Sequence, residues 1–421
     1  MEAFYVVGPC RLSGNVRIHG AKNSVLPLLA ASLLCRESCE LTNCPDLSDV
    51  HTALAILQAL GAPAQREKDR IVLSPWDGTV CEIPEELMRR MRSSIIFLGA
   101  ILGRAGEAAL SLPGGCELGP RPVDLHLQAM RALGATVRED HGKIRCEAPG
   151  GLKGAQIVLA FPSVGATENA LLAAATASGT TVLENAAREP EIEDLAGFLN
   201  ACGACIRGAG ESTIVVEGVK RLSGASYRVI PDRIEAATYL AAAAATGSAI
   251  TLVDVIPRHL RPVLAVLQEA GCRFSGRGRV LSIEAPARLS RIHSVRTMPY
   301  PGFPTDAQAP VLAASTLARG TSIFVENIFE ERYKHVGELL RMGASIRVDG
   351  RVAVVEGVER LSGARVQAAD LRGGAGLLVA ALAAQGETVL EGVCHLDRGY
   401  EHIEDALCAL GAQVKRRVME G

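Results

Sequence analysis

An amphipathic helical run followed by Gly-Ala, or once by Gly-Cys, recurs along the whole chain. Its final glycines are Gly61, Gly134, Gly203, Gly271, Gly343 and Gly411, separated by 73, 69, 68, 72 and 68 residues. So regular a period is typical of an array of repeated units. Each glycine stands where a left-handed residue caps the last turn of a helix.

Each unit also carries the pattern of a strand and of a second, more buried helix. β-Branched segments introduced by Gly or Ser precede the amphipathic helices, for example at 179–184 and 386–391. Ala- and Leu-rich stretches such as 166–178 and 233–246 are apolar on nearly every face, which predicts buried helices. Six units favour two lobes of three, because three buried helices flanked by sheets close one core. We therefore expect an α/β fold of two similar domains, with a ligand site in the cleft between them.

The second unit is longer than the others. From the residue that opens its strand to the capping glycine it spans 28 residues (106 to 134), whereas the other units span 23 to 25. The excess falls in 112–126, between a strand and a helix, and an insertion in one copy of a symmetric array is a common place for function. Its glycines let the backbone bend while its prolines restrict it, as in a lid.

Cys116 lies on this loop. Because it is flanked by Gly-Gly and Glu-Leu-Gly, it has little core to fill, and a chemical role is favoured over packing. A thiol can act as an acid, a base or a nucleophile near neutral pH, and Arg121 nearby would favour its thiolate form.

Charged residues recur at the predicted helix starts. They are Lys22, Arg92, Asp232, Arg233, Asp306 and Arg372. Helix N-termini already attract anions, and a cation placed there lowers the stability of the helix. Lysine and arginine residues at these positions therefore indicate a phosphate or carboxylate ligand. Asp306 lies in a Gly- and Pro-rich turn and is either an N-cap or a base for a hydroxyl group; the pattern leaves both open.

Composition narrows the class of protein. Lys and Arg number 44 against 46 Asp and Glu, so no overall field attracts nucleic acid or a membrane surface. The N-terminal segment lacks a secretory pattern and the uncharged stretch 236–253 is interrupted at Thr246, so we expect a cytoplasmic protein. The 12 cysteines show no paired CxxC framework, and we interpret the lone pair Cys202 and Cys205 as structural. The glycine motifs that bind nucleotides are lacking. We expect neither a metal nor a cofactor.

These motifs together resemble the UDP-N-acetylglucosamine 1-carboxyvinyltransferases, a family within the enolpyruvyl transferase superfamily. The resemblance runs end to end and is carried by residues 20–23, 112–116, 121–126, 163–167, 185–191, 303–306, 370–372 and 397–400. It implies the enolpyruvyl transferase fold, with two inside-out α/β barrel domains of three units each, 22–229 and 1–21 with 230–421. It also implies transfer of the enolpyruvyl group of phosphoenolpyruvate to the 3'-hydroxyl of UDP-N-acetylglucosamine with release of phosphate, the first committed step of peptidoglycan synthesis.

The resemblance further implies roles for single positions. Cys116 would protonate the methylene carbon of phosphoenolpyruvate, can carry an adduct and is the site that fosfomycin alkylates, while Asp306 would take the proton of the sugar hydroxyl. Phosphoenolpyruvate would be bound by Lys22, Asn23, Arg92, Arg121 and Arg398. UDP-N-acetylglucosamine would be bound by Asn23, Arg92, Arg121, Pro122, Val123, Asp124, Leu125, Ser163, Val164, Gly165, Asp306 and Ile328. Supporting positions would be His126, Arg332, Asp370 and Arg372. No metal is implied, since Arg and Lys supply the positive charge.

Two other functions share part of this pattern. A 3-phosphoshikimate 1-carboxyvinyltransferase has the same six units and the same donor but lacks the loop with the cysteine. A non-catalytic paralogue that senses nucleotide sugar would not need Lys22, Cys116, Asp306 and Arg398 together, so the enzyme is favoured. One departure from the family concerns 373–376, where Gly-Gly-Ala-Gly follows Arg372; glycine lowers helix propensity, which predicts a looser helix start.

Overall fold

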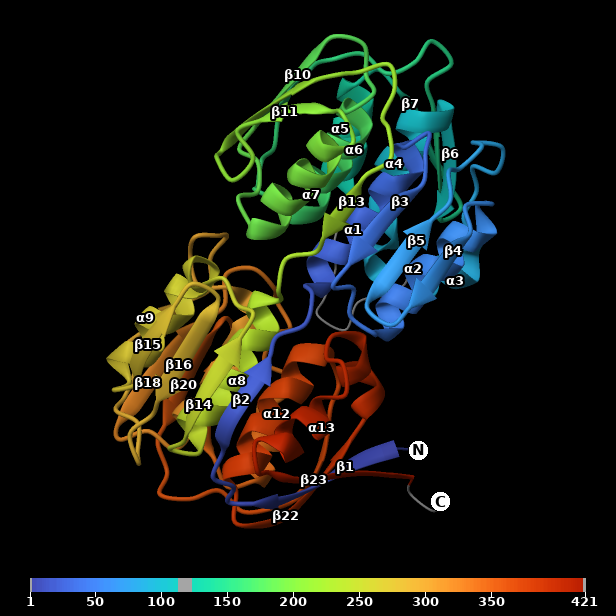
Figure 1. Ribbon diagram of the computed structural model, residues 1–421. Coiled ribbons are helices and arrows are strands. Elements are labelled where there is room, and N and C mark those ends of the chain that lie inside the picture. The colour runs from blue at the N-terminus through green and yellow to red at the C-terminus, as the bar shows by residue number, and fades with distance from the viewer. Residues whose placement is uncertain (1, 113–122, 419–421) are drawn as a thin grey trace. The chain divides into compact units, whose positions relative to one another are not determined.

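The computed structural model describes residues 2–112 and 123–418. These residues form two compact units: the first unit comprises 20–112 with 123–230, and the second unit comprises 2–19 with 231–418 (Figure 1). The domain bounds that the resemblance implies stay a prediction. Cys116, Arg121 and Pro122 lie outside the described residues.

Buried helices form the interior of the first unit. They are α1 (Lys22–Ala31), α4 (Phe97–Ala105) and α6 (Val164–Ala174), and α4 packs against both of the others. Small residues allow this close approach: a Cβ atom on Gly99 would lie 2.3 Å from the backbone oxygen of Asn169. Only glycine fits there, and its N–H donates to the Oδ1 atom of the same asparagine at 2.7 Å.

Three sheets flank these helices in the described part of the first unit. Their strand orders are β13-β3-β5-β4, β11-β12-β10-β9 and β6-β8-β7. The strands are β3 (Cys39–Thr42), β4 (Ala64–Glu67), β5 (Arg70–Leu73), β6 (Glu107–Ser111), β7 (Thr136–Asp140), β8 (Lys143–Glu147), β9 (Gln156–Val158), β10 (Thr180–Glu184), β11 (Cys205–Arg207), β12 (Thr213–Glu217) and β13 (Ser226–Arg228). The other helices are α2 (Ser48–Ala59), α3 (Glu85–Arg90), α5 (Asp124–Ala132), α7 (Pro190–Ala201), η1 (Ser32–Leu34) and η2 (Arg92–Ile96).

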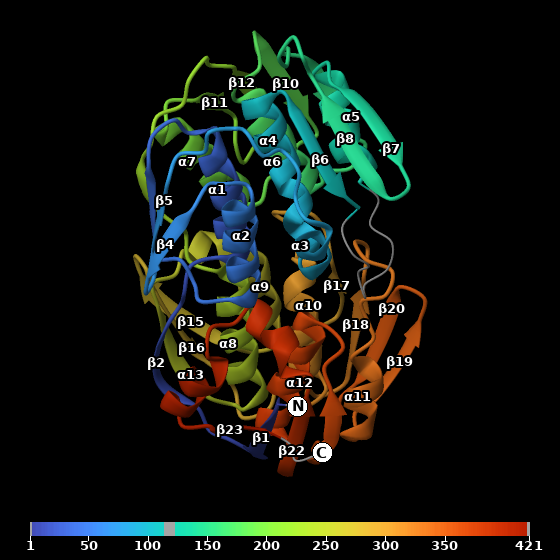
Figure 2. The same ribbon diagram turned by 90° about the vertical axis from the view of Figure 1, so that its right-hand side faces the viewer.

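The second unit repeats this plan. Its interior helices α8 (Arg233–Ala245), α10 (Gln308–Ser315) and α12 (Leu371–Ala383) all contact one another and are almost entirely buried (Figure 2). Its described residues form sheets of order β21-β22-β1-β23, β15-β16-β14-β2 and β17-β18-β20-β19.

The elements around these helices complete the second unit. The strands are β1 (Glu2–Gly8), β2 (Ser13–Arg17), β14 (Ala249–Val253), β15 (Arg273–Arg277), β16 (Val280–Glu284), β17 (Val295–Arg296), β18 (Thr321–Val325), β19 (Ser345–Asp349), β20 (Val352–Glu356), β21 (Arg365–Gln367), β22 (Gly386–Glu391) and β23 (Gln413–Val418). The outer helices are α9 (Arg261–Glu269), α11 (Val336–Arg341), α13 (Ile403–Ala409), η3 (Pro257–Leu260), η4 (Thr305–Ala307) and η5 (Val393–Arg398).

The structure confirms the repeat that the sequence predicts. The six capping glycines all have positive φ values, between 86° and 99°, which side-chain-bearing residues rarely adopt. Five of the six sheets in the described residues place the strand that follows a buried helix beside the antiparallel strand of a hairpin, as β10 lies beside β12. Helices inside and sheets outside make each unit an inside-out α/β barrel of three repeats.

Two sheets depart from the common pattern. In the sheet of β6, a single parallel bridge between Glu82 and Ala109 stands where other sheets have a parallel strand. In the last sheet, β1 inserts between β22 and β23 and pairs with both in antiparallel register. The strand that completes the sixth repeat therefore comes from the opposite end of the chain.

In the part of the chain that the structure describes, no helix is long and apolar enough to cross a membrane. The stretch 236–253, which raises that question in the sequence, divides into α8 and β14, as its central Thr-Gly-Ser predicts.

Candidate active site

Lys22, the first residue of α1, is held by an ion pair inside the first unit. Its Nζ atom lies 2.6 Å from the Oδ2 atom of Asp49, and the two side chains are only 9% and 3% exposed. A buried ammonium group needs such a partner, so Asp49 determines where the lysine charge is held. The sequence did not point to Asp49, because an acidic residue in the first turn of α2 is an ordinary helix-terminal charge.

The start of α1 is rigid for two further reasons. A Cβ atom on Gly20 would lie 1.8 Å from the backbone oxygen of Asn43, so the chain before the helix passes too close for any other residue. Ser24 donates to the buried carboxylate of Asp194, which also accepts from the hydroxyl of Tyr227 at 2.9 Å. Burial raises the pKa of Asp194 to about 6 despite these hydrogen bonds. Asn23, next to Lys22, is half-buried on this fixed turn.

His126 connects two segments that the resemblance assigns to the nucleotide sugar. The amide of Asn169 accepts from Gly99 and donates to the Nδ1 atom of His126 at 2.7 Å, so this ring nitrogen is an acceptor. Burial, together with the charge of Arg92, lowers the pKa of His126 to about 4. The ring is therefore neutral at physiological pH, with its proton on Nε2.

Gly165 lies against the same imidazole ring. A Cβ atom there would come within 3.0 Å of the Cε1 atom of His126, which explains a glycine in the first turn of α6. Ser163 is the N-cap of this helix and accepts from the N–H of Ala166, and Val164 is its first residue.

Val123 precedes the neighbouring helix α5, whose first residues are Asp124 and Leu125. Because α5 packs against α6, the structure brings the two predicted segments, 123–125 and 163–165, to the starts of two touching helices. Such helix starts favour anionic groups.

Asp306 is the centre of a charged cluster in the second unit. Its Oδ1 atom accepts from Arg332 at 2.7 Å and its Oδ2 atom accepts from Arg372 at 3.0 Å. The arginine side chains are 2% and 5% exposed, whereas the carboxylate is 26% exposed. The possibility that Asp306 is an N-cap is wrong, because it lies inside η4, whose N-cap is Pro304, and the N-cap of the following helix α10 is Ala307. Two guanidinium groups instead favour its ionised form.

Glu326 binds the two segments that lie next to this cluster, one with Ile328 and one with Thr305. The sequence did not point to Glu326 as a functional residue. One carboxylate oxygen accepts from the N–H groups of Ile328 and Phe329 at 2.8 and 2.9 Å. The other accepts from Thr305 and Gln308 at 3.1 and 3.2 Å. The side chain of Glu326 thus ties the segment with Ile328 to η4, which carries Asp306.

Arg372 is positioned by the start of α12. Asp370 is the N-cap and accepts from the N–H groups of Arg372 and Gly373 at 2.9 and 3.0 Å. The guanidinium group also contacts the buried Tyr400, whose hydroxyl lies 3.4 Å from its Nη1 atom. The looser helix start stays a prediction. A Cβ atom at Gly373 would lie 2.7 Å from the side chain of Asp370, so close packing accounts for the glycine.

Arg398 ends η5, which packs against α12. Its neighbour Asp397 accepts two hydrogen bonds from Arg416, at 2.6 and 3.1 Å, and Arg416 also donates to Glu404 at 2.6 Å. The last strand therefore anchors the short helix that carries Arg398.

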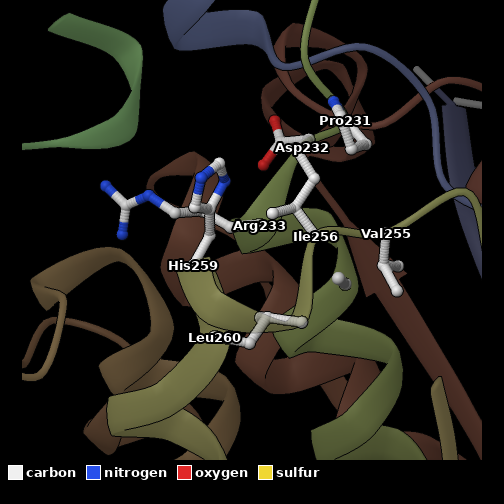
Figure 3. Close-up of a pocket in the computed structure, with 8 residues that line it drawn as sticks. Pro231, Asp232, Arg233, Val255, Ile256, His259 and Leu260 are labelled. Atoms are coloured by element: carbon white, nitrogen blue, oxygen red, sulfur yellow. The ribbon is translucent and has the colours of Figure 1, made fainter. Parts of the chain in front are cut away.

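A small hollow lies at the start of α8, lined in part by Asp232, Arg233 and His259 (Figure 3). Asp232 is the N-cap of α8 and accepts from the N–H groups of Ile234 and Glu235. Burial, then the nearby charges of Arg258 and Arg233, lower the pKa of His259 to about 4. The hollow has essentially no room for a water molecule, so it is not a ligand pocket.

The fold is that of the enolpyruvyl transferases. The enolpyruvyl transferase NikO from Streptomyces tendae superposes with a TM-score of 0.88 at 27% identity, covering 99% of this chain and 98% of that one. An EPSP synthase from Acinetobacter baumannii shares the fold, with a TM-score of 0.76 at 18% identity, over 99% of this chain and all of the other.

Sequence comparison assigns the chain to one family among the proteins with this fold. The family model of EPSP synthase (3-phosphoshikimate 1-carboxyvinyltransferase) matches residues 6–407. UDP-N-acetylglucosamine 1-carboxyvinyltransferase 1 of Carboxydothermus hydrogenoformans is 50% identical over 99% of this chain and 98% of its own length. UDP-N-acetylglucosamine 1-carboxyvinyltransferase 2 of Caldanaerobacter subterraneus is 48% identical over 99% of this chain and its full length. The chain belongs to the UDP-N-acetylglucosamine 1-carboxyvinyltransferase family, which confirms the resemblance seen in the sequence.

Proposed function

We propose that this chain transfers the enolpyruvyl group of phosphoenolpyruvate to the 3'-hydroxyl of UDP-N-acetylglucosamine and releases phosphate. Relatives of that name match it over its whole length. The structural observation that carries the proposal is the carboxylate of Asp306, held by two buried arginines and still one quarter exposed. In keeping with the expectation from the sequence, we propose that the reaction takes place in the cytoplasm.

In the proposed reaction the sugar hydroxyl gives its proton to Asp306 while its oxygen forms a bond to C2 of phosphoenolpyruvate. The electron pair of the carbon–carbon double bond takes a proton at C3 from the thiol of Cys116, which gives a tetrahedral ketal. The methyl group at C3 then returns a proton to the thiolate of Cys116 and the double bond re-forms. Phosphate leaves with the electron pair of its bond to C2 and takes up the proton that Asp306 had accepted. Each proton transfer of this kind contributes roughly 10²- to 10⁴-fold to the rate.

The anionic groups of both substrates require positive charge and N–H donors. We propose Lys22, Asn23, Arg92, Arg121 and Arg398 for phosphoenolpyruvate, and the helix starts at 123–125 and 163–165, together with Ile328, for the nucleotide sugar. The ion pair of Lys22 with Asp49 supports this, because it holds an ammonium group at the first turn of a helix. Fixed cations of this kind stabilise charge that develops as phosphate departs.

Release of phosphate from the two substrates tests the proposal directly. Cys116→Ala and Asp306→Asn should each lower kcat at least 100-fold, whereas Asp349→Asn, an exposed carboxylate at the end of β19 in the same unit, should leave it unchanged. Fosfomycin should add its mass to the natural chain and not to Cys116→Ala. Full activity of Cys116→Ala or of Asp306→Asn would refute the assigned chemistry.

The same assay separates the two other functions. Phosphate release with 3-phosphoshikimate in place of the nucleotide sugar would identify the sibling activity. Binding of UDP-N-acetylglucosamine without phosphate release, measured by calorimetry in the presence of phosphoenolpyruvate, would identify a sensor.

A further inference from the structure

Three buried cysteines of the first unit converge at one point. Cys35 follows η1, Cys39 begins β3, and Cys202 follows the last turn of α7. Their sulfur atoms all lie within 4.8 Å of one another, and none of the three residues is more than 2% exposed. The chemistry proposed above uses none of them.

Ordinary packing explains this arrangement poorly. A buried cysteine is usually a small apolar side chain, as Cys146 is in the same unit. In the cluster, by contrast, three sulfurs that could bind one ion meet in the core, each within 4.8 Å of the other two.

The geometry is close to that of a bound metal ion. In a triangle with sides of at most 4.8 Å the centre lies at most about 2.8 Å from each sulfur, and movement by roughly 0.5 Å per sulfur would give the 2.3 Å typical of a zinc–sulfur bond. Among the described residues, no histidine or carboxylate completes the cluster. Structural zinc takes four protein ligands, so three sulfurs alone suit a softer ion of lower coordination number.

The surroundings also favour a cation. Cys202 stands at the C-terminus of α7, a helix of 12 residues, where the helix dipole places partial negative charge. Residues 36–38, which connect Cys35 with Cys39, are exposed, so only one short turn separates the sulfurs from solvent. A cation bound here would join this turn to the end of α7.

We propose that Cys35, Cys39 and Cys202 form a three-sulfur binding site for a soft, thiophilic monovalent cation, with Cu(I) as the representative ion. Each thiol that becomes a ligand releases its proton to solvent as its sulfur–metal bond forms, and the ion keeps its oxidation state, so no oxidant is needed. The site is independent of the transfer reaction and does not depend on its assignment.

The test measures binding of Cu(I) to the full chain. The reduced protein is first treated under native conditions with N-ethylmaleimide, which blocks accessible thiols such as those of Cys394 and Cys408. Cu(I) is then titrated against the chelator bathocuproine disulfonate, and X-ray absorption at the copper edge counts the sulfur ligands. The variants are Cys35→Ala, Cys39→Ala and Cys202→Ala, with Cys146→Ala as the matched control because it removes a buried thiol of the same unit that stands outside the cluster.

We expect one Cu(I) per chain with three sulfur ligands, complete loss of this ion in each cluster variant, and full retention in the control. Binding should also raise the midpoint of thermal unfolding of the natural chain. Three outcomes would each overturn the proposal. They are an unchanged ratio of Cu(I) to chain in Cys202→Ala, only two sulfur ligands on the bound ion, and a disulfide between two of the three cysteines in the freshly purified chain. Should a cluster variant fail to fold, the ligand count on the natural chain still decides.

Discussion

Glu326 offers the sharpest test of how the second unit positions its charged cluster. Its side chain is 1% exposed, and its oxygens accept from the N–H groups of Ile328 and Phe329 and from the side chains of Thr305 and Gln308. Glu326→Ala removes every one of these acceptors. The two backbone N–H groups, which are part-buried, would then lose their acceptor.

The expected magnitude follows from those bonds. A hydrogen bond to a charged acceptor contributes roughly 1.5–3 kcal/mol, so loss of the two backbone bonds should lower the free energy of unfolding by about 4 kcal/mol. Glu326→Gln keeps an oxygen for both N–H groups. Its amide can donate to Gln308 once that side chain turns its oxygen, which has no partner in the described structure, toward position 326. We expect this variant to lose only about 1 kcal/mol.

Urea unfolding of the purified variants measures these differences, and phosphate release measures their effect on activity. Glu330→Ala is the matched control, because Glu330 is exposed on the same segment and should change stability by less than about 0.5 kcal/mol. Since Glu326 holds both the segment with Ile328 and the turn with Asp306, Glu326→Ala should raise KM for the nucleotide sugar and lower kcat. Equal stability of Glu326→Ala and Glu330→Ala would refute the reasoning. An equal loss of unfolding free energy in Glu326→Gln and Glu326→Ala would show that the charge of Glu326 matters more than the geometry of its acceptor oxygens.

Three further predictions concern packing and protonation. Gly165→Ala should cost about 1–3 kcal/mol in urea unfolding, because its Cβ atom would press on His126 at 3.0 Å; stability equal to that of the natural chain would contradict this contact. The pKa of His126 is lowered to about 4 in the folded state, so its contribution is complete above pH 6.5 and is lost as the pH falls towards 4. Between pH 6.5 and 4 the free energy of unfolding of His126→Gln should therefore fall by about 3 kcal/mol less than that of the natural chain. Parallel curves of stability against pH would rule out a buried neutral ring. Tyr400→Phe should cost about 1 kcal/mol, because its hydroxyl bonds to Thr238 at 2.8 Å and contacts Arg372; a loss below about 0.3 kcal/mol in the same assay would show that these bonds contribute little.

The sequence alone determined the repeat, the class of fold and the family. Capping glycines, strand openings and buried helices follow from interactions between residues a few positions apart, so their pattern is legible along the chain. The positive φ of all six capping glycines and the bounds of α8 agree with that pattern. Charged residues at the helix starts were visible for the same reason.

Tertiary structure decided which of those charges meet. Asp306 pairs with arginines 26 and 66 residues away, so no local pattern could distinguish this cluster from an N-cap. Cys39 and Cys202 meet only because β3 and the end of α7 fold against the same core. Contacts of this kind depend on how helices and sheets pack, which a hydrophobic period constrains only in outline.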